Sequence, residues 1–178
     1  MELIDNKLKL RAFRNSDSKK LTELCNNRKI WNNLRDNIPF PYTKENADDF
    51  IQYCKIEAPQ FTFAIEFNDE FVGTIGLIRQ NDIYKFTAEI GYWIGEPYWG
   101  KGIATKAVRL ITEYGFHKLG LVRIHTGVFD FNKGSQRVLE KAGFKLEGIF
   151  EKSIVKNDKI CNEYRYAMIN KNANQQLP

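Results

Sequence analysis

Alternating apolar and polar residues predict strands in the middle of the chain. Residues 61–67 (FTFAIEF) and 71–77 (FVGTIGL) place an apolar residue or glycine at every second position. The Asn68-Asp69 pair between them favours a turn, so the two segments are expected to form a hairpin. A third strand is expected over residues 85–94. One of its faces would carry Phe86, Ala88, Ile90, Tyr92 and Ile94, and the other Thr87, Glu89, Gly91 and Trp93.

Helical spacing of apolar residues predicts four helices. Polar residues 15–17 supply capping chemistry for a first helix, and Thr43 caps a second that runs to about Ile56. A third, amphipathic helix is expected over residues 104–117, and a fourth over residues 132–142. Further strands are predicted at residues 3–14, at 121–129, from Phe144 onward and near 160–169.

The segment 31–42 is expected to be a loop, because Pro39 and Pro41 cannot continue a helix. Its aromatic side chains look exposed and are candidates for the wall of a substrate-binding pocket. The alternative role is anchoring of the loop, and both interpretations stay open. The three residues are Trp31, Phe40 and Tyr42.

Composition is typical of one globular α/β domain. A chain of 178 residues suits a single domain, expected over residues 1–170, followed by a polar, disordered tail over residues 171–178. The formal charge of +5 comes without a run of basic residues, which argues against a nucleic-acid-binding tail and suits an anionic ligand. Three isolated cysteines, no signal peptide and no long apolar stretch predict a cytoplasmic protein without membrane insertion or a Cys/His metal site.

The segment WGKGIAT (99–105) joins the third strand to the third helix. Gly100 and Gly102 allow a sharp turn and let a ligand approach the backbone. The following helix would point its unpaired N–H groups and positive dipole end at that turn, which favours a pyrophosphate. Neither the P-loop pattern nor the dinucleotide fingerprint fits, because Thr105 stands where the fingerprint needs its third glycine. On its own, such a turn is more often a plain strand–helix connection.

A second motif, FNKGSQRVLEKAGF, follows about 30 residues downstream. With EIGYWI (89–94), WGKGIATKAV (99–108) and NKGSQRVLEKAGF (132–144), the chain resembles the GNAT acetyltransferase superfamily from about residue 8 to residue 169. It looks most like the RimJ/RimL branch of ribosomal-protein N-terminal acetyltransferases. The resemblance implies a single α/β (α+β) domain with a mixed, mostly antiparallel sheet of six to seven strands. That sheet would splay at the cofactor site, with four helices beside it.

The same resemblance implies acetyl-coenzyme A (acetyl-CoA) as co-substrate. Its pantetheine arm would pair with the strand at Tyr92–Ile94, and its pyrophosphate would bind backbone N–H groups of Gly100–Thr105. Asn132 would hydrogen-bond the ligand, cap its helix, or do both. Candidates for phosphate contacts, each equally consistent with a solvated surface charge, are Lys101, Lys106 and Arg137. The full set of cofactor-binding candidates is Tyr92, Trp93, Ile94, Trp99, Gly100, Lys101, Gly102, Ile103, Ala104, Thr105, Asn132 and Arg137.

Two residues are candidates for acid–base catalysis. The amine must lose a proton before it attacks, and Glu89 beside the splay is the candidate base, with an exposed strand residue as the alternative. Many superfamily members carry a Tyr in the second motif that protonates the departing thiolate, but Leu139 stands there. Ser135, one turn earlier, is the substitute donor that the RimJ/RimL pattern suggests, or else a small residue for close helix packing. A backbone N–H near Gly91–Trp93 would stabilise the oxyanion.

The predicted function is transfer of an acetyl group from acetyl-CoA to a primary amine by direct attack, without a covalent enzyme intermediate. The acceptor would be a protein N-terminus or a small-molecule amine such as a polyamine or an antibiotic, selected by segments 28–60 and 150–165. The alternative is a non-catalytic acyl-CoA-binding sensor, which needs neither Glu89 nor Ser135. Ribosome or RNA binding is a third hypothesis, which the charge pattern does not require. A homodimer is compatible with each of them.

Overall fold

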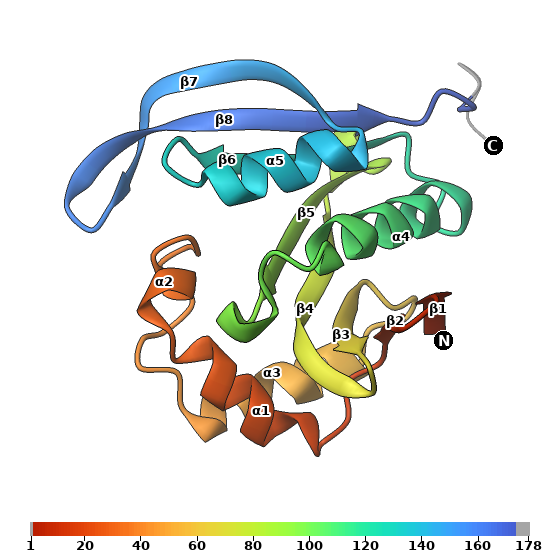
Figure 1. Cartoon of the computed structure of the whole chain (residues 1–178). Helices are drawn as coiled ribbons and strands as arrows, with labels where there is room; N and C mark the ends of the chain where they lie inside the picture. Colours follow the sequence, from red (N-terminus) through yellow and green to blue (C-terminus); the bar gives the residue numbers. More distant parts are fainter. Residues whose placement is uncertain (1, 174–178) are drawn as a thin grey trace.

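A sheet of eight strands forms the centre of the computed structural model, which describes residues 2–173 (Figure 1). The strands lie in the order β1-β2-β3-β4-β5-β6-β8-β7. Neighbouring strands are antiparallel except β5 and β6, which are parallel. The strands are β1 (Glu2–Asp5), β2 (Leu8–Arg11), β3 (Thr62–Phe67), β4 (Glu70–Arg79), β5 (Thr87–Ile94), β6 (Arg123–Phe129), β7 (Lys145–Lys156) and β8 (Lys159–Ile169).

Helices cover both faces of this sheet. One face packs against α4 (Ile103–His117) and α5 (Lys133–Ala142), and the other against α1 (Asp17–Cys25) and α3 (Lys44–Lys55) (Figure 1). The short helix α2 (Arg28–Trp31) follows α1 in the chain. Within residues 2–173, no helix is long and apolar enough to cross a membrane.

The predicted alternation of β5 is confirmed. Ala88, Ile90 and Ile94 are buried in the main core with α4. Trp93 packs instead against the second core, which contains residues of α1 and α3. Because successive side chains of a strand point to opposite faces, Glu89 lies on the α1/α3 face of the sheet and Tyr92 on the α4/α5 face.

Strands β5 and β6 part soon after they meet. They pair only over residues 87–89 of β5 and 123–125 of β6. Beyond this point β5 stays paired with β4 up to Ile94, and β6 stays paired with β8 up to Phe129. An opening bordered by unpaired backbone therefore lies in the middle of the sheet, as the family resemblance implies.

Two features of the fold differ from the prediction. Residues 3–14, expected to form one strand, contain the hairpin β1-β2, with a turn at Asn6 (φ 60°). β1 lies at the edge with Ile4 exposed, so burial imposes no alternation on it, and the sheet has eight strands instead of six to seven. The helix α2 has four residues, too few for a helical period, and raises the number of α-helices to five. The tail expected over residues 171–178 lies, from residue 174, outside the described residues.

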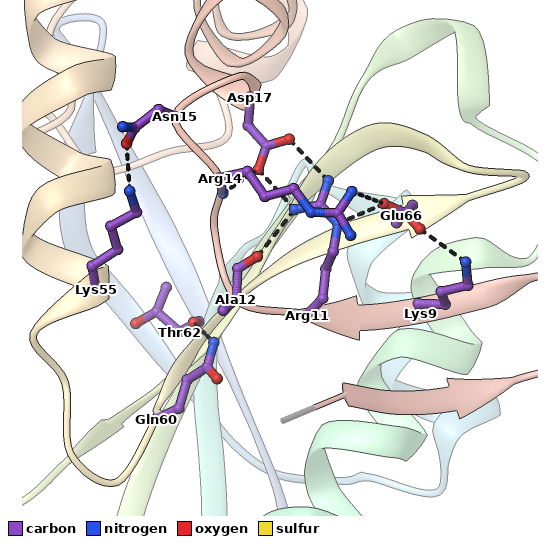
Figure 2. Close-up of polar contacts among 10 residues, drawn as sticks. All are labelled: Lys9, Arg11, Ala12, Arg14, Asn15, Asp17, Lys55, Gln60, Thr62 and Glu66. Carbon is purple, nitrogen blue, oxygen red and sulfur yellow. Dashed lines mark hydrogen bonds and ion pairs between the residues drawn. The ribbon is translucent and has the colours of Figure 1, made fainter.

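A buried ionic network fixes the first helix on the sheet (Figure 2). The Arg11 guanidinium of β2 donates to Asp17 of α1 (Nη1–Oδ2, 2.7 Å) and to Glu66 of β3 (Nε–Oε2, 2.5 Å), and these three side chains are at most 6% exposed. Lys9 and Arg14 also contact the Glu66 carboxylate. Because a buried charge is tolerated only when it is paired, the network holds β2, β3 and α1 in one arrangement.

Candidate active site

A cleft of about 1520 Å³ occupies the opening between β5 and β6. Its walls include β4, β5, β6, the turn before α4, the first turns of α5, the loop 33–38 after α2, and the β7–β8 hairpin. Glu89, Tyr92 and Ser135 all line it, so the predicted base, strand and donor are brought together. Since Glu89 and Tyr92 point to opposite faces of the sheet, the cleft is reached from both faces.

The glycine-rich turn lies at one mouth of the cleft. Gly100 and Gly102 have φ values of 76° and 75°, in the left-handed region that favours glycine. Across the described part of the chain, no acceptor is found for the backbone N–H groups of residues 100–105, whereas the N–H groups on either side are bonded. These successive donors precede and open a helix of 15 residues. Together with the helix dipole they form a strong site for an anion.

Backbone atoms dominate this part of the site. Ile103 is buried in the core, so only its main chain is available to a ligand. The indole N–H of Trp99 donates to the Ile94 carbonyl at 2.6 Å and ties the turn to the end of β5. Lys101 does not line the cleft, and its Nζ lies 5.4 Å from the Tyr98 ring centroid. The Lys101 side chain is therefore not positioned to contact a ligand phosphate in the cleft.

A row of cations on α5 faces the cleft. Lys133, Arg137 and Lys141 are spaced four residues apart, share one side of the helix and all line the cleft. The prediction names only Arg137, although the i,i+4 spacing indicates the other two. Lys106 lies 3.9 Å from Asp5 and does not line the cleft. Of the three predicted phosphate-contact candidates, Lys101, Lys106 and Arg137, only Arg137 lines the cleft.

The start of α5 places a pair of hydroxyl groups at the cleft. Asn132 is the N-cap residue, with its Oδ1 accepting the Ser135 N–H at 3.1 Å, so its predicted capping role is confirmed. Ser135 Oγ lies 2.8 Å from Tyr92 Oη, between α5 and β5. Burial raises the pKa of Tyr92 to about 12, and the hydrogen bond with Ser135 offsets only part of that effect. Leu139 is buried in the core and offers no polar group.

The predicted base, Glu89, is ion-paired. Its carboxylate contacts the guanidinium of Arg35, a residue of the loop after α2 that the prediction does not name. The Glu89 side chain is 18% exposed and that of Arg35 is 66% exposed. His125 pairs with Glu89 in the sheet, and burial lowers the pKa of its imidazole, which favours the neutral form. Any other cation that binds Glu89 would have to displace Arg35.

A second carboxylate, Glu163 of β8, also lines the cleft. It fills the space beside Gly127, where a Cβ would lie 2.5 Å from Glu163 Cδ. Arg165 donates to this carboxylate from Nε at 2.8 Å. The sequence prediction omits Glu163, because only the strand order, which sets β8 beside β6, reveals that it reaches the cleft.

The three aromatic residues predicted for the acceptor pocket do not share one location. Tyr42 lines the cleft but is only 7% exposed, so its predicted exposure is wrong, since it packs in the core between α1 and α3. Trp31 and Phe40 stack with ring centroids 5.5 Å apart, and neither lines the cleft. Trp31 instead supports Lys156 of β7, whose Nζ lies 3.6 Å from the indole centroid. Lys156 itself forms part of the wall.

Comparison with known proteins identifies the family. Residues 7–145 match the acetyltransferase (GNAT) domain family, and the chain therefore belongs to the GNAT acetyltransferases. The probable N-acetyltransferase YjcK of Bacillus subtilis is 48% identical over 87 residues, which are 49% of this chain and 48% of that protein. The chain thus matches about half the length of that relative.

Two Escherichia coli enzymes match over more of the chain. Spermidine N(1)-acetyltransferase is 28% identical over 141 residues, which are 79% of this chain and 74% of that protein. Ribosomal-protein-serine acetyltransferase is 28% identical over 176 residues, which are 93% and 94% of the two chains. A GNAT acetyltransferase structure from Bacillus anthracis superposes with a TM-score of 0.82 at 26% identity, over 95% of this chain and 98% of that one. The predicted GNAT family and fold and the relationship to ribosomal-protein acetyltransferases are confirmed.

Proposed function

We propose that this protein transfers the acetyl group of acetyl-CoA to a primary amine by direct attack on the thioester. One observation carries the proposal: the backbone N–H groups of residues 100–105 have no acceptor within the described chain and lie at the mouth of the cleft. The pyrophosphate of acetyl-CoA would satisfy these donors. Its charge would be balanced by Lys133, Arg137 and Lys141 of α5.

The open edge of β5 supports a position for the pantetheine arm. Gly95 N–H bonds to Val72 O of β4, so the alternation of the strand turns the N–H groups of Ile94 and Tyr92 toward the opening. An arm that carries amides would pair with the Ile94 N–H as an added strand and leave the Tyr92 N–H for the thioester carbonyl. It would run from the turn at residues 100–105 along β5, with its thioester near Ser135.

The reaction would begin when Glu89 removes a proton from the ammonium, because only the neutral amine has a lone pair. The nitrogen then attacks the carbonyl carbon, and the backbone N–H of Tyr92 stabilises the oxyanion. The C–S bond breaks with its electron pair on sulfur, and Ser135 faces that sulfur as a hydrogen-bond donor. Glu89 and Tyr92 flank the opening from opposite faces of the sheet, which fits an amine and a thioester that approach from opposite faces.

The acceptor in this proposal is a protein N-terminus or a small-molecule amine. The names of the two Escherichia coli relatives refer to spermidine and to a ribosomal-protein serine, so both classes belong in the test. Arg35, Asp36 and Lys156 line the end of the cleft where the acceptor would bind. The protein would act in the cytoplasm, where Cys25, Cys54 and Cys161, which are free, stay reduced.

Release of coenzyme A thiol from acetyl-CoA, assayed over a panel of polyamines, N-terminal peptides and aminoglycosides, tests the proposal. We expect turnover with at least one amine and a loss of about 10²–10³-fold in Glu89→Gln. Glu113→Gln, at an exposed position of α4, is the matched control. Loss of turnover in Glu163→Gln but not in Glu89→Gln would move the role of base to Glu163. Tight binding of acetyl-CoA without turnover of any amine would identify a sensor instead.

A further inference from the structure

The proposed reaction uses the Ser135 hydroxyl but gives no role to the Tyr92 hydroxyl that contacts it. Tyr92 Oη lies 2.8 Å from Ser135 Oγ and 3.5 Å from the Ser135 carbonyl oxygen. Within residues 2–173 these are the hydrogen-bond partners of the Tyr92 hydroxyl, and both belong to Ser135. Tyr92 comes from β5 and Ser135 from α5, and both line the cleft.

The geometry indicates which hydroxyl is the donor. Either oxygen of the 2.8 Å contact can donate, but a phenol is more acidic than an alkyl hydroxyl and is therefore the stronger donor, which assigns the donor role to Tyr92. The Ser135 carbonyl, at 3.5 Å, is a weaker second acceptor on the same side, and in this arrangement the Ser135 hydroxyl hydrogen is not used by Tyr92. The Ser135 N–H is already bonded to Asn132 Oδ1 at 3.1 Å, which fixes the residue at the start of the helix. The Ser135 hydroxyl hydrogen is therefore available to a group in the cleft.

A hydroxyl that accepts a hydrogen bond becomes a better donor, because successive hydrogen bonds polarise one another. Ser135 alone is a weak donor for a leaving sulfur. Leu139, on the same helix, is buried in the core and has no polar group to add. The Tyr92 phenol, which lies on β5, donates to the Ser135 hydroxyl and polarises it.

We propose that Tyr92 is a positioning residue that holds the Ser135 hydroxyl with its hydrogen directed at the coenzyme A sulfur. This inference rests on the proposed function. As the amine nitrogen bonds to the carbonyl carbon and the C–S bond breaks, the electron pair stays on sulfur, and Ser135 donates a hydrogen bond to the thiolate. The nitrogen, which carries a positive charge after the attack, releases its second proton to water. Coenzyme A leaves as the thiolate and is protonated from water.

A hydrogen bond fits the chemistry better than full proton transfer. A free thiol has a pKa of about 8.5, whereas the pKa of Tyr92 is about 12 and that of an alkyl hydroxyl is higher still. Neither hydroxyl is acidic enough to protonate a thiolate at neutral pH. Both can stabilise it, and the pair should therefore lower the pKa of the bound coenzyme A thiol.

The pH dependence of coenzyme A binding tests this role without any acceptor amine. When the thiol pKa is lower in the complex, coenzyme A binds more tightly as the pH rises toward about 8.5. Acetyl-CoA has no ionisable thiol and serves as the reference at each pH. For the unaltered protein, calorimetry between about pH 6 and pH 9 should show the ratio of the two Kd values changing by about tenfold, which corresponds to one pKa unit.

Three variants separate the roles of the two hydroxyl groups. Tyr92→Phe keeps the ring and should remove most of the tenfold change, Ser135→Ala should remove all of it, and the double variant should match Ser135→Ala. Tyr164→Phe, a half-buried tyrosine of β8 outside the cleft wall, is the matched control and should keep the full change. Thermal unfolding with acetyl-CoA checks that each variant folds and binds.

Two results would overturn the inference. One is an unaltered pH dependence in Tyr92→Phe, and the other is the absence of any pH dependence in the unaltered protein that binds both ligands. In either case the cofactor site and the proposed function would stand. Failure of the unaltered protein to bind coenzyme A and acetyl-CoA at all would instead overturn the proposed function, and this inference with it.

Discussion

Lys156 and Trp31 join two distant parts of the chain, with Lys156 Nζ 3.6 Å from the indole centroid. The same ammonium lies 2.6 Å from Asp36 Oδ1, and the Lys156 side chain is 1% exposed. Beside it, Asn157 donates to the side-chain oxygen of Asn32 at 3.1 Å. The tip of the β7–β8 hairpin, which bends toward α2 in Figure 1, is thereby fastened to the segment after α2. This contact closes the side of the cleft that is lined by Arg35, Asp36 and Lys156.

Lys156→Met is expected to loosen this closure. The Met side chain keeps much of the apolar contact with Trp31, but it loses the cation–π attraction and the ion pair with Asp36. The free energy of unfolding should fall by about 1–2 kcal/mol, measured in urea. Lys159→Met, on the exposed tip of the same hairpin, is the control. Equal stability of the two variants would show that the contact contributes nothing measurable.

The ionic network around Arg11 predicts acid sensitivity. Burial opposes ionisation of Glu66, but hydrogen bonds from Arg11 and Lys9 outweigh it and hold the pKa of Glu66 below its usual 4.5. A lowered pKa stabilises the folded state above about pH 4.5, and the stabilisation is lost as the pH falls through the folded-state value. Urea unfolding from neutral to acidic pH should therefore lose stability more steeply in the unaltered protein than in Glu66→Gln. Parallel decline of the two proteins would contradict this assignment.

Gly102→Ala is expected to weaken the cofactor site. At a φ of 75° an alanine is strained by about 1–2 kcal/mol. Both the stability of the protein and its affinity for coenzyme A should therefore decrease. Calorimetric titration with coenzyme A measures the second effect. Gly91→Ala is the comparison, because a Cβ at Gly91 meets no atom within 4 Å and its backbone is that of an ordinary strand. An unchanged affinity in Gly102→Ala would argue against the turn as the pyrophosphate site.

Gly91→Val tests the acceptor side of β5. Gly91 lies on the same face as Glu89 and opens onto the cleft, so a larger side chain would occupy space there. We expect the KM for the amine to rise by about tenfold while the affinity for acetyl-CoA stays within about twofold. Steady-state kinetics with an amine from the panel distinguishes the two substrates. A reduced affinity for acetyl-CoA alone would place Gly91 on the cofactor side.

Local patterns suffice to predict the backbone features of the proposed cofactor site. The alternation of β5 and the glycines at 100 and 102 act through neighbours in the chain, so a short window of sequence contains the whole signal. The row formed by Lys133, Arg137 and Lys141 is local as well, and helical spacing alone could have revealed it. These features require no knowledge of which strands pair.

Contacts between distant segments escape such patterns. Arg35 lies 54 positions from Glu89, and Asp36 lies 120 positions from Lys156, so both ion pairs depend on the strand order. Tyr92 and Ser135 are both predicted site residues, yet their contact spans 43 positions and follows only from the packing of α5 beside β5. Periodicity predicts the face of the helix or strand on which a side chain lies, but it does not predict which residue of another segment will contact it.

The parting of β5 from β6 also bears on how such an enzyme can acquire new specificities. In β5, Glu89 and Gly91 point to one face of the sheet and Tyr92 points to the other. A substitution on one face can therefore leave the contacts of the other face unchanged. Under the proposed function, mutations in the loop at 33–38 and in the hairpin tip would change the preferred amine and leave the backbone donors before α4 unaltered. Acceptor preference and cofactor binding would then be able to change independently.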